Sequence, residues 1–475
     1  MSWIDISIFC FYLISMLSVG FYFMRKNSTT DDYYVGGRKL SSLHIGLSVV
    51  ATDVGGGFSI GLGGLGFTMG LSGSWLLFTG LVGAWLSSVM LIPKVSDLAR
   101  KKGFLSFPQF LEHVFNKRIA LLAGIISAIG YIGFTSSQIL AGAKLASSTF
   151  ASLSLNQALL IMGMVAVVYT VLGGLKAVIY TDTIQWIVLM AGLIFVGLPF
   201  AYIKTGGIEA VRITLEPSFL SLGSITWQKL VNWMFTIIPI WFIGMTLYQR
   251  IYAAKDTKTA KKGWFIAGLF EYPIMAFIGV LLGMFARVAL EKGLLPGYSA
   301  SNLDPEMGLP VLLRTILPVG FLGIVLSAYF SAIMSTADSC LMAASGNVLT
   351  DVLKRHNDKK GLFYSQVLTL FIGVISLLIA LKMTSVLELM LHSYSFMVSG
   401  MFIPVLAALF LKKPDSVAAL FSMISGGCTT LLLIISGVSL PLDLDANIFG
   451  IGVSLVTYAI VNFYHIKISS FSGIK

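Results

Sequence analysis

Long apolar stretches follow one another along almost the whole chain, and each is long enough to cross a lipid bilayer. A bilayer-spanning helix needs about 20 mostly apolar residues, and inside lipid its backbone polar groups must be satisfied internally. We therefore predict an all-α, polytopic membrane protein with about 13 transmembrane helices. The predicted spans are residues 3–24, 41–69, 75–96, 119–148, 156–174, 182–203, 229–250, 264–290, 316–349, 363–381, 386–410, 417–437 and 447–465.

The composition excludes the soluble alternatives. Of 475 residues, 56% are hydrophobic and only 11% are charged, whereas a soluble globular chain carries about 25% charged residues. Several soluble domains of this composition could not cover their surfaces, and the high hydrophobicity excludes a disordered chain. We expect a single transmembrane domain over residues 1–475, with the lipid bilayer as its solvent.

The basic residues are distributed in a way that predicts the topology. If the N-terminus lies outside, most of the 32 Lys and Arg residues fall in inner loops, as the positive-inside bias requires. This predicts a multi-pass plasma-membrane protein with a cytoplasmic C-terminus, and the short loops favour a bacterial inner membrane. The same bias explains the net charge of +11, so we expect neither a nucleic-acid partner nor an obligatory protein partner. The exceptions to the bias are Lys144, Lys204, Arg212, Lys229, Arg287, Lys292, Arg314 and Lys382.

Enzyme and channel signatures are weak. No HExxH or GxxxxGK[ST] motif occurs, and the nearest His–acid pair is His392 with Glu388. Residues 61–66 match the letters of GxGxxG but lie inside an apolar span with no preceding strand, where close helix packing through small residues explains them better. No loop resembles a channel filter. We expect a transporter rather than an enzyme.

Three of the acids within predicted spans stand out, because a carboxyl group there is costly and is a functional candidate by default. They are Asp53 in the second span, Asp182 at the start of the sixth and Asp338 in the ninth. For Asp182 an equal alternative is that it caps the first turn of its helix.

The second span contains the run Gly55-Gly56-Gly57 directly after Asp53. Each glycine in a helix costs about 1 kcal/mol relative to alanine, so we expect the helix to unwind locally. Unwinding frees backbone carbonyls that can bind an alkali cation, while half-helix N-termini suit an anionic group of a solute. The alternative is that the glycines only permit close helix packing.

The ninth span carries four side chains with oxygen atoms within five residues. A single hydroxyl in a membrane helix usually bonds the carbonyl one turn back, which explains any one of them but not the added carboxylate. Together they indicate an oxygen cage for a hard monovalent cation. The four residues are Ser335, Thr336, Asp338 and Ser339.

Several motifs in order along the chain resemble the solute:sodium symporter family, and the resemblance covers about residues 3–465. Its strongest segment is residues 170–178 (TVLGGLKAV), followed by Thr181-Asp182 and Gln185. Residues 36–38 (GGR), Gln249-Arg250 and Ser335-Thr336 also match. The proline-, pantothenate- and choline-like branches are closer in these features than the sugar branch.

The resemblance implies a leucine-transporter-like fold with two inverted five-helix repeats. The first repeat would be residues 41–203 and the second residues 229–410, with 3–24 and 417–465 as peripheral helices. The glycine-broken second span opens the first repeat, and its counterpart, the seventh span, holds Pro239 and Gly244 between apolar runs. Interrupted helices at corresponding places in two halves point to the binding site.

The resemblance also implies ligands for Na+, the ion expected to drive transport. The first site would use backbone oxygens of Ala51, Val54 and Ala332 with the hydroxyls of Ser335 and Thr336. A second site, known in one branch, would use Ser335, Asp338, Ser339 and Asp182. Asp338 departs from that branch, which has Ser there. Two nearby carboxylates would repel each other unless a cation or a proton intervened, so a second ion and proton coupling both stay open.

The predicted solute site combines the broken second span with aromatic residues of the seventh. Apolar side chains at Phe58 and Ile237 count against a sugar, and aromatic rings suit an ammonium-bearing solute through cation–π contact. We therefore expect sodium-coupled import of a small organic solute, an amino acid or a choline- or betaine-like amine. Alternatives are a proton-coupled transporter of the same fold, or a sodium symporter of a carboxylic acid or sugar. The predicted residues are Asp53, Gly55, Gly56, Phe58, Trp241 and Tyr248.

Overall fold

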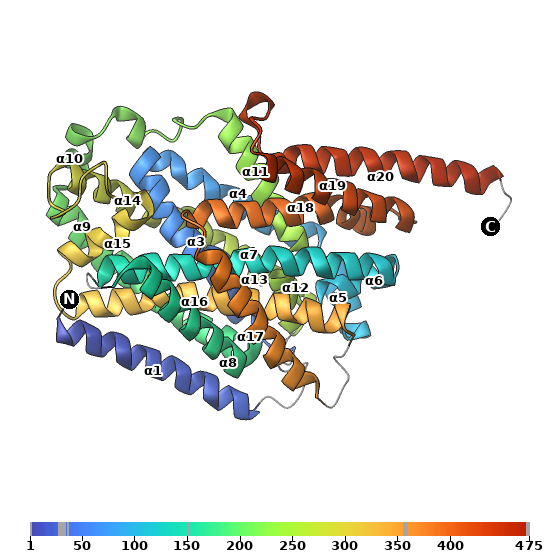
Figure 1. Ribbon diagram of the computed structural model, residues 1–475, viewed down its shortest axis with the longest axis horizontal. Coiled ribbons are helices and arrows are strands. Elements are labelled where there is room, and N and C mark those ends of the chain that lie inside the picture. Colours follow the sequence, from blue (N-terminus) through green and yellow to red (C-terminus); the bar gives the residue numbers. More distant parts are fainter. Residues whose placement is uncertain (1, 27–34, 36–37, 151–152, 355–359, 472–475) are drawn as a thin grey trace.

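The computed structural model describes residues 2–26, 35, 38–150, 153–354 and 360–471 (Figure 1). Within some helices the side chains lie outside this description, among them those of Gly57, Phe58 and residues 172–180. The predicted solute contact of Phe58 and the side chains of the motif at 172–180 therefore fall outside the described part of the chain.

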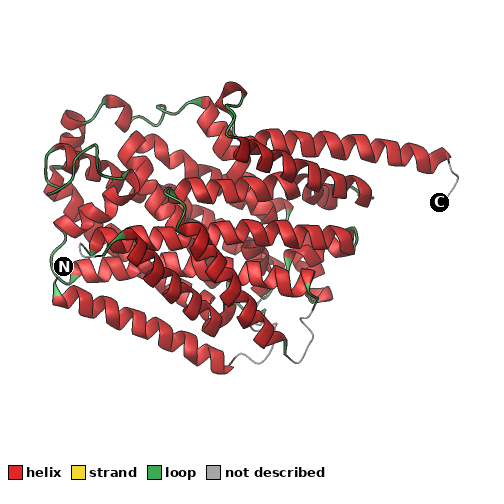
Figure 2. Cartoon of the chain, in the orientation of Figure 1, coloured by secondary structure: helices red, strands yellow, loops and turns green. Residues whose placement is uncertain are grey.

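Every regular element in the described residues is a helix (Figure 2), and the one β-bridge pairs Leu40 with Ala254. The elements are α1 (Trp3–Lys26), α3 (Ser42–Met69), η1 (Gly70–Ser74), α4 (Trp75–Met90), α5 (Ile92–Lys102), α6 (Phe107–Val114), α7 (Lys117–Thr149), α8 (Leu155–Gly192), η2 (Leu193–Gly197), α9 (Leu198–Thr205), α10 (Gly207–Thr214), η3 (Pro217–Leu220), α11 (Trp227–Ile243), α12 (Met245–Ala253), α13 (Thr257–Leu269), η4 (Phe270–Met275), α14 (Ala276–Glu291), α15 (Pro305–Ile316), α16 (Phe321–Asn347), η5 (Val348–Val352), α17 (Gly361–Ala380), α18 (Val386–Phe410), α19 (Ser416–Ser436), η6 (Pro441–Asp443) and α20 (Ala446–Phe471).

The helices confirm a polytopic all-α membrane protein. Across the described residues, 9 helices are long and apolar enough to cross a membrane, or 10 if α11 and α12 form one bent span. Two further apolar helices, Trp3–Met16 and Leu155–Val171, are shorter over their described parts. The predicted number of about 13 spans, counted at about 20 residues each, stays a prediction.

One boundary differs from the sequence prediction. The predicted fifth and sixth spans lie in a single helical run, α8, which continues through the π-helical turn η2 into α9. The N-cap of α8 is Ser154, which forms a capping box with Gln157. Asp182 lies in the interior of α8, so the alternative that it caps a helix is wrong.

The core is built around α3 and α16. The α3 helix packs against α13, α14, α15 and α16, while α16 also packs against α7 and α8. Glycines permit the closest of these contacts: a Cβ at Gly66 would lie 2.1 Å from the Val280 carbonyl oxygen, and one at Gly283 would lie 2.1 Å from that of Gly63. Close backbone approach through small residues is the usual way in which membrane helices associate.

The first and last helices lie at the edges of the bundle (Figure 1). The α1 helix packs on α8 and α16, and its Asp5 carboxylate accepts bonds from the amides of Gly320 (2.8 Å) and Gly323 (2.9 Å) at the start of α16. A carboxylate at a helix N-terminus is stabilised by the helix dipole. The α19 and α20 helices pack chiefly on each other and on α18.

Three breaks interrupt apolar helical runs in the part of the chain that the structure describes. Gly55 interrupts α3 with non-helical angles (φ 18°, ψ −158°). Gly244 separates α11 from α12, which are bent by 42°. Tyr272 interrupts the run from α13 to α14 (φ −137°, ψ 124°). The breaks in the predicted second and seventh spans are thus confirmed, and the break at Tyr272 is a new feature.

Candidate ion and solute site

The break in α3 brings its backbone against α16. The Thr336 hydroxyl of α16 donates to the Ala51 carbonyl of α3 at 3.0 Å and also reaches the Ala332 carbonyl at 3.2 Å. A side chain at position 55 would prevent this approach, because a Cβ at Gly55 would lie 2.0 Å from Thr336 Oγ1. The structure therefore brings together the two helices that the sequence predicted to share an ion.

The predicted ligands of the first sodium site are all buried at this junction. Ala51, Val54 and Ala332 are each at most 2% exposed, as are Ser335 and Thr336. The two hydroxyls reach different neighbours: Thr336 contacts α3, whereas Ser335 donates to the carboxylate of Asp182 on α8. Hydroxyl and carbonyl oxygens are hard ligands suited to Na+.

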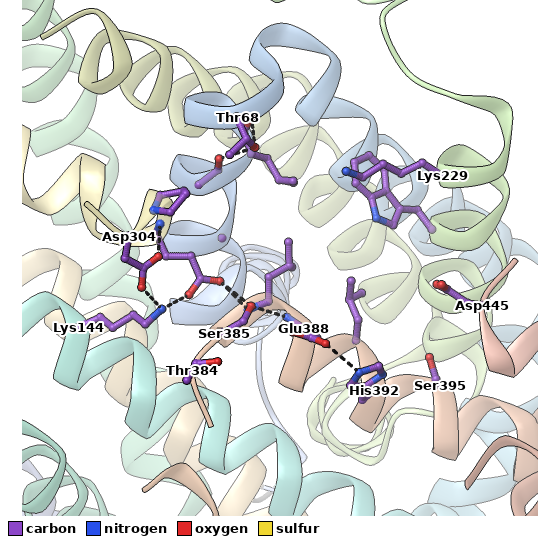
Figure 3. A pocket seen from close by; sticks show the side chains of 18 of the residues that line it. Thr68, Lys144, Lys229, Asp304, Thr384, Ser385, Glu388, His392, Ser395 and Asp445 are labelled. Carbon is purple, nitrogen blue, oxygen red and sulfur yellow. Dashed lines mark hydrogen bonds and ion pairs between the residues drawn. The ribbon is translucent and has the colours of Figure 1, made fainter. Parts of the chain in front are cut away.

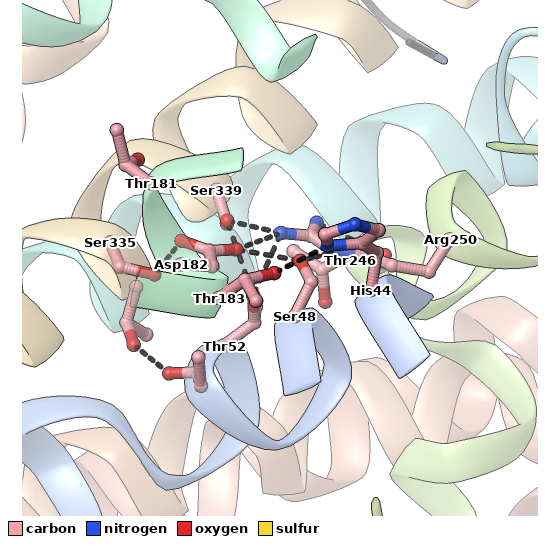
Figure 4. A network of polar contacts seen from close by, with 12 residues as sticks. His44, Ser48, Thr52, Thr181, Asp182, Thr183, Thr246, Arg250, Ser335 and Ser339 are labelled. Carbon is pink, nitrogen blue, oxygen red and sulfur yellow. Dashed lines mark hydrogen bonds and ion pairs between the residues drawn. The ribbon is translucent and has the colours of Figure 1, made fainter. Parts of the chain in front are cut away.

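Asp182 is the centre of a buried polar network that joins four helices, α3, α8, α12 and α16 (Figure 4). Its carboxylate accepts from the Ser48 hydroxyl of α3 at 2.6 Å and from Ser335 of α16, and it lies 3.5 Å from the guanidinium of Arg250 on α12. Both charged side chains are completely buried. Such charge-assisted bonds hold the Ser335 hydroxyl in one orientation beside the α3 break.

Arg250 is a member of this network that the sequence prediction missed. Counting basic residues placed it in an inner loop, but the structure places it inside the protein, so that assignment is wrong. Its guanidinium donates to Thr52 and Ser339 at 2.7 Å each and to Ser48 at 3.2 Å. A buried carboxylate needs a compensating charge, and Arg250 supplies it to Asp182. The Gln249-Arg250 motif was the sequence feature that could have indicated this role.

Asp338 and Ser339 lie in different surroundings, although they are neighbours in the sequence. Ser339 bonds Arg250, and its hydroxyl lies 3.4 Å from that of Thr52. The Asp338 carboxylate accepts from the Thr170 hydroxyl of α8, while its Oδ2 has no hydrogen-bond partner in the described part of the chain. The structure therefore brings Ser335, Ser339 and Asp182 into one network and places Asp338 beside it.

The predicted solute residues lie in separate surroundings. The Gly56 amide donates to the Gln138 side chain at 2.8 Å. Trp241 is buried against α4, where a Cβ at Gly83 would lie 2.4 Å from its ring. Tyr248 packs on Phe107 of α6 with ring centroids 4.6 Å apart, and its hydroxyl donates to the Phe242 carbonyl. Asp53 is buried and interacts with the carboxyl group of Glu271.

Glu271 is the second functional candidate that the sequence prediction missed. It lies in the π-helical turn η4, which contacts both α3 and α4. It is completely buried. A glutamate within the predicted eighth span was the available signal, because acids inside a membrane are functional candidates by default.

A cavity of about 680 Å³ opens at the helix ends that the sequence predicts to be outside (Figure 3). On one side Lys144 of α7, only 2% exposed, forms ion pairs with Asp304 (2.5 Å) and Glu306 (2.6 Å). On the other side lies Asp445, whose pKa is raised by partial burial and lowered in part by nearby His392. Lys144 is one of the exceptions to the positive-inside bias, and these two acids are its partners.

Comparison with known proteins agrees with this architecture. A model of the sodium:solute symporter family matches residues 33–426. The osmoregulated proline transporter OpuE of Bacillus subtilis (strain 168) is 28% identical over 473 residues, which cover 94% of this chain and 93% of the relative. The high-affinity proline transporter PutP of the same organism is 27% identical over 450 residues, which cover 89% and 91%.

A solved structure of a Na+-coupled sialic acid symporter, in a substrate-bound outward-open state, shares the fold. It matches with a TM-score of 0.81 and 21% identity over 97% of both chains. Because the family model spans most of this chain, the protein belongs to the sodium:solute symporter family.

Proposed function

We propose that the protein is a sodium-coupled secondary active symporter that imports a small organic solute by alternating access. The observation that carries this proposal is the contact between the Thr336 hydroxyl and the Ala51 carbonyl, 3.0 Å apart, at the break in α3. It joins a hydroxyl-rich helix to a broken helix in the middle of the bundle. Irregular backbone is tolerated at membrane depth where it is buried in protein or lines a cavity.

Sodium would bind between α3 and α16. Its ligands would be the carbonyl oxygens of Ala51, Val54 and Ala332 and the hydroxyls of Ser335 and Thr336. The burial of all five residues supports this assignment. Inward movement of one positive charge across a potential of 100 mV, negative inside, gains about 2.3 kcal/mol, and the sodium gradient adds to this driving force.

The acidic network beside this site would orient Ser335 rather than hold a second sodium ion. Arg250 already supplies a positive charge to Asp182 and occupies the Ser339 hydroxyl. Asp338 stands next to the network with one unpartnered oxygen. We therefore propose one sodium ion per cycle, with Asp182 as a positioning residue.

The solute would be an amino acid or a related amine. The two proline transporters named above support this class, as do the buried acid Asp53 beside the α3 break and the buried aromatic ring of Trp241. Two inverted repeats, residues 41–203 and 229–410, would rock against each other to expose the site alternately. The N-terminus would lie outside and the C-terminus in the cytoplasm of a bacterial cell.

Solute uptake into proteoliposomes tests the proposal. The purified protein is reconstituted, and sodium and pH gradients are imposed separately while uptake of labelled amino acids, L-proline first, is measured. We expect accumulation only with inward sodium, enhanced by an inside-negative potential, and loss of the sodium response in Thr336→Val. Accumulation driven by the pH gradient alone would establish proton coupling and contradict the sodium assignment.

A further inference from the structure

Two acids deep in the bundle lie on neighbouring elements, α3 and η4, and neither forms an ion pair within the described residues. Glu271 is completely buried and Asp53 is 6% exposed. Neither oxygen of Glu271 has a hydrogen-bond partner in the described residues, and the same holds for Oδ2 of Asp53. The α3 helix that carries Asp53 contacts the η4 turn that carries Glu271, and the two carboxyl groups act on each other. Two carboxylates in a dry site repel each other unless a proton or another cation joins them.

Two other buried acids, Asp182 and Glu306, already have a basic partner. Asp182 has Arg250 and two hydroxyl donors. Glu306 has Lys144 and the amides of α18. An uncompensated carboxylate costs several kcal/mol in a protein interior, so an incoming cation would be stabilised by joining the Asp53–Glu271 pair.

The pair also lies where two helices are interrupted. Asp53 precedes the break at Gly55 by two residues, and Glu271 directly precedes the break at Tyr272. Glu271 packs against α4, because a Cβ at Gly80 would lie 2.3 Å from its Oε2. Trp241 packs against Gly83, one turn further along the same helix. Interrupted membrane helices mark solute sites in transporters of this kind.

The number of unpartnered oxygen atoms defines the chemistry of the ligand. Asp53 Oδ2, Glu271 Oε1 and Glu271 Oε2 each lack a donor, and a primary ammonium group has three N–H donors and no acceptor. A quaternary ammonium group has no N–H donor and would leave these oxygens unsatisfied. The ring of Trp241 in α11 packs against Gly83 of α4, and an aromatic ring is suited to contact a cation.

We propose that the ammonium group of the transported solute binds between Asp53 and Glu271, and that the protein selects amines by their N–H donors. The proposal rests on the proposed symport function and deepens it. It assigns the solute to primary and secondary amines, including amino acids, and excludes choline- and betaine-like quaternary amines.

Two N-methylation series test this selectivity at constant charge. Glycine, sarcosine, dimethylglycine and glycine betaine form the first, and ethanolamine, its mono- and dimethyl derivatives and choline form the second. The common amino acids and short diamines complete the panel. Purified full-length protein in sodium is titrated with each compound, and the thermal stabilisation gives an apparent affinity.

We expect stabilisation by N–H-bearing compounds, a fall in affinity with each N-methyl group and no stabilisation by quaternary compounds. Glu271→Gln and Asp53→Asn should weaken binding of the best amine about 10- to 100-fold, the usual range for losing a charge-assisted hydrogen bond in a buried site. Glu209→Gln is the matched control, because Glu209 is an exposed acid paired with Arg212 and its neutralisation should leave affinity unchanged.

Sodium-induced stabilisation separates the two proposals. If sodium stabilises wild type and Glu271→Gln equally, the fold and the ion site are intact, and any loss of amine binding belongs to the pair. Stabilisation by no N–H-bearing amine, equal binding of quaternary analogues, or unchanged amine affinity in Glu271→Gln would overturn the inference while leaving sodium symport in place. A protein that sodium does not stabilise would contradict the proposed function itself.

Discussion

Replacing Gly55 with alanine tests the junction between α3 and α16 directly. The new Cβ would lie 2.0 Å from Thr336 Oγ1 and 2.6 Å from Thr336 Cβ, whereas ordinary contacts begin at 3.4 Å. The two helices must therefore separate by about 1.4 Å at this point. A metal site tolerates deviations of only about 0.2 Å in its ligand distances, so Thr336 and the α3 carbonyls could no longer share one ion.

We expect the single methyl group added in Gly55→Ala to cause a large loss of sodium affinity. Overpacking of this kind costs about 1–3 kcal/mol, and each 1.4 kcal/mol corresponds to about tenfold in affinity. We expect the sodium concentration for half-maximal uptake to rise about tenfold or more in Gly55→Ala.

The assay is sodium-dependent uptake in proteoliposomes at equal protein density. The matched control is Gly452→Ala in α20, because no atom lies within 4 Å of the Cβ it would add, so its sodium dependence should equal that of wild type. A wild-type sodium requirement in Gly55→Ala would refute the reasoning, since it would mean that the close approach of Thr336 to α3 does not support ion binding.

Three further substitutions test the rest of the site. Thr336→Val replaces the hydroxyl by a methyl group and should raise the sodium requirement, whereas Thr336→Ser should retain sodium-dependent uptake; equal uptake curves for both would contradict the ligand assignment. Asp182→Asn leaves Arg250 without its counter-charge, and because breaking a buried ion pair costs about 3–5 kcal/mol, we expect a lower apparent Tm and impaired uptake; the assignment fails if both stay at wild-type values. Lys144→Met removes the partner of Glu306 and should lower the apparent Tm, while the sodium concentration for half-maximal uptake should not change; a shift in that concentration would show that the outer ion pairs act on the ion site.

The helix breaks show which features of the fold could be predicted from local sequence. Glycine has a known cost in a helix, so the run after Asp53 indicated unwinding, and Pro239 with Gly244 indicated a break in the seventh span. Both were found. The break at Tyr272 was not predicted, because its proline at position 273 lies within one long apolar run.

The oxygen-bearing side chains of the ninth span could also be predicted from the sequence, since spacing on a helix is a local property. Their hydrogen-bond partners could not be predicted in this way. Ser335 bonds an acid 153 residues away, and Thr336 bonds a carbonyl 285 residues away. The resemblance to a family, rather than any pattern in this chain, predicted that these segments meet.

The sequence by itself determined the solvent of the protein, its helical class and the membrane-buried groups that needed an explanation, because hydropathy, glycine content and buried acids act locally along a chain. Only the tertiary structure decided which acids are compensated. It placed Arg250 beside Asp182 and left Glu271 facing Asp53, because charges on different helices become neighbours only through the packing of those helices.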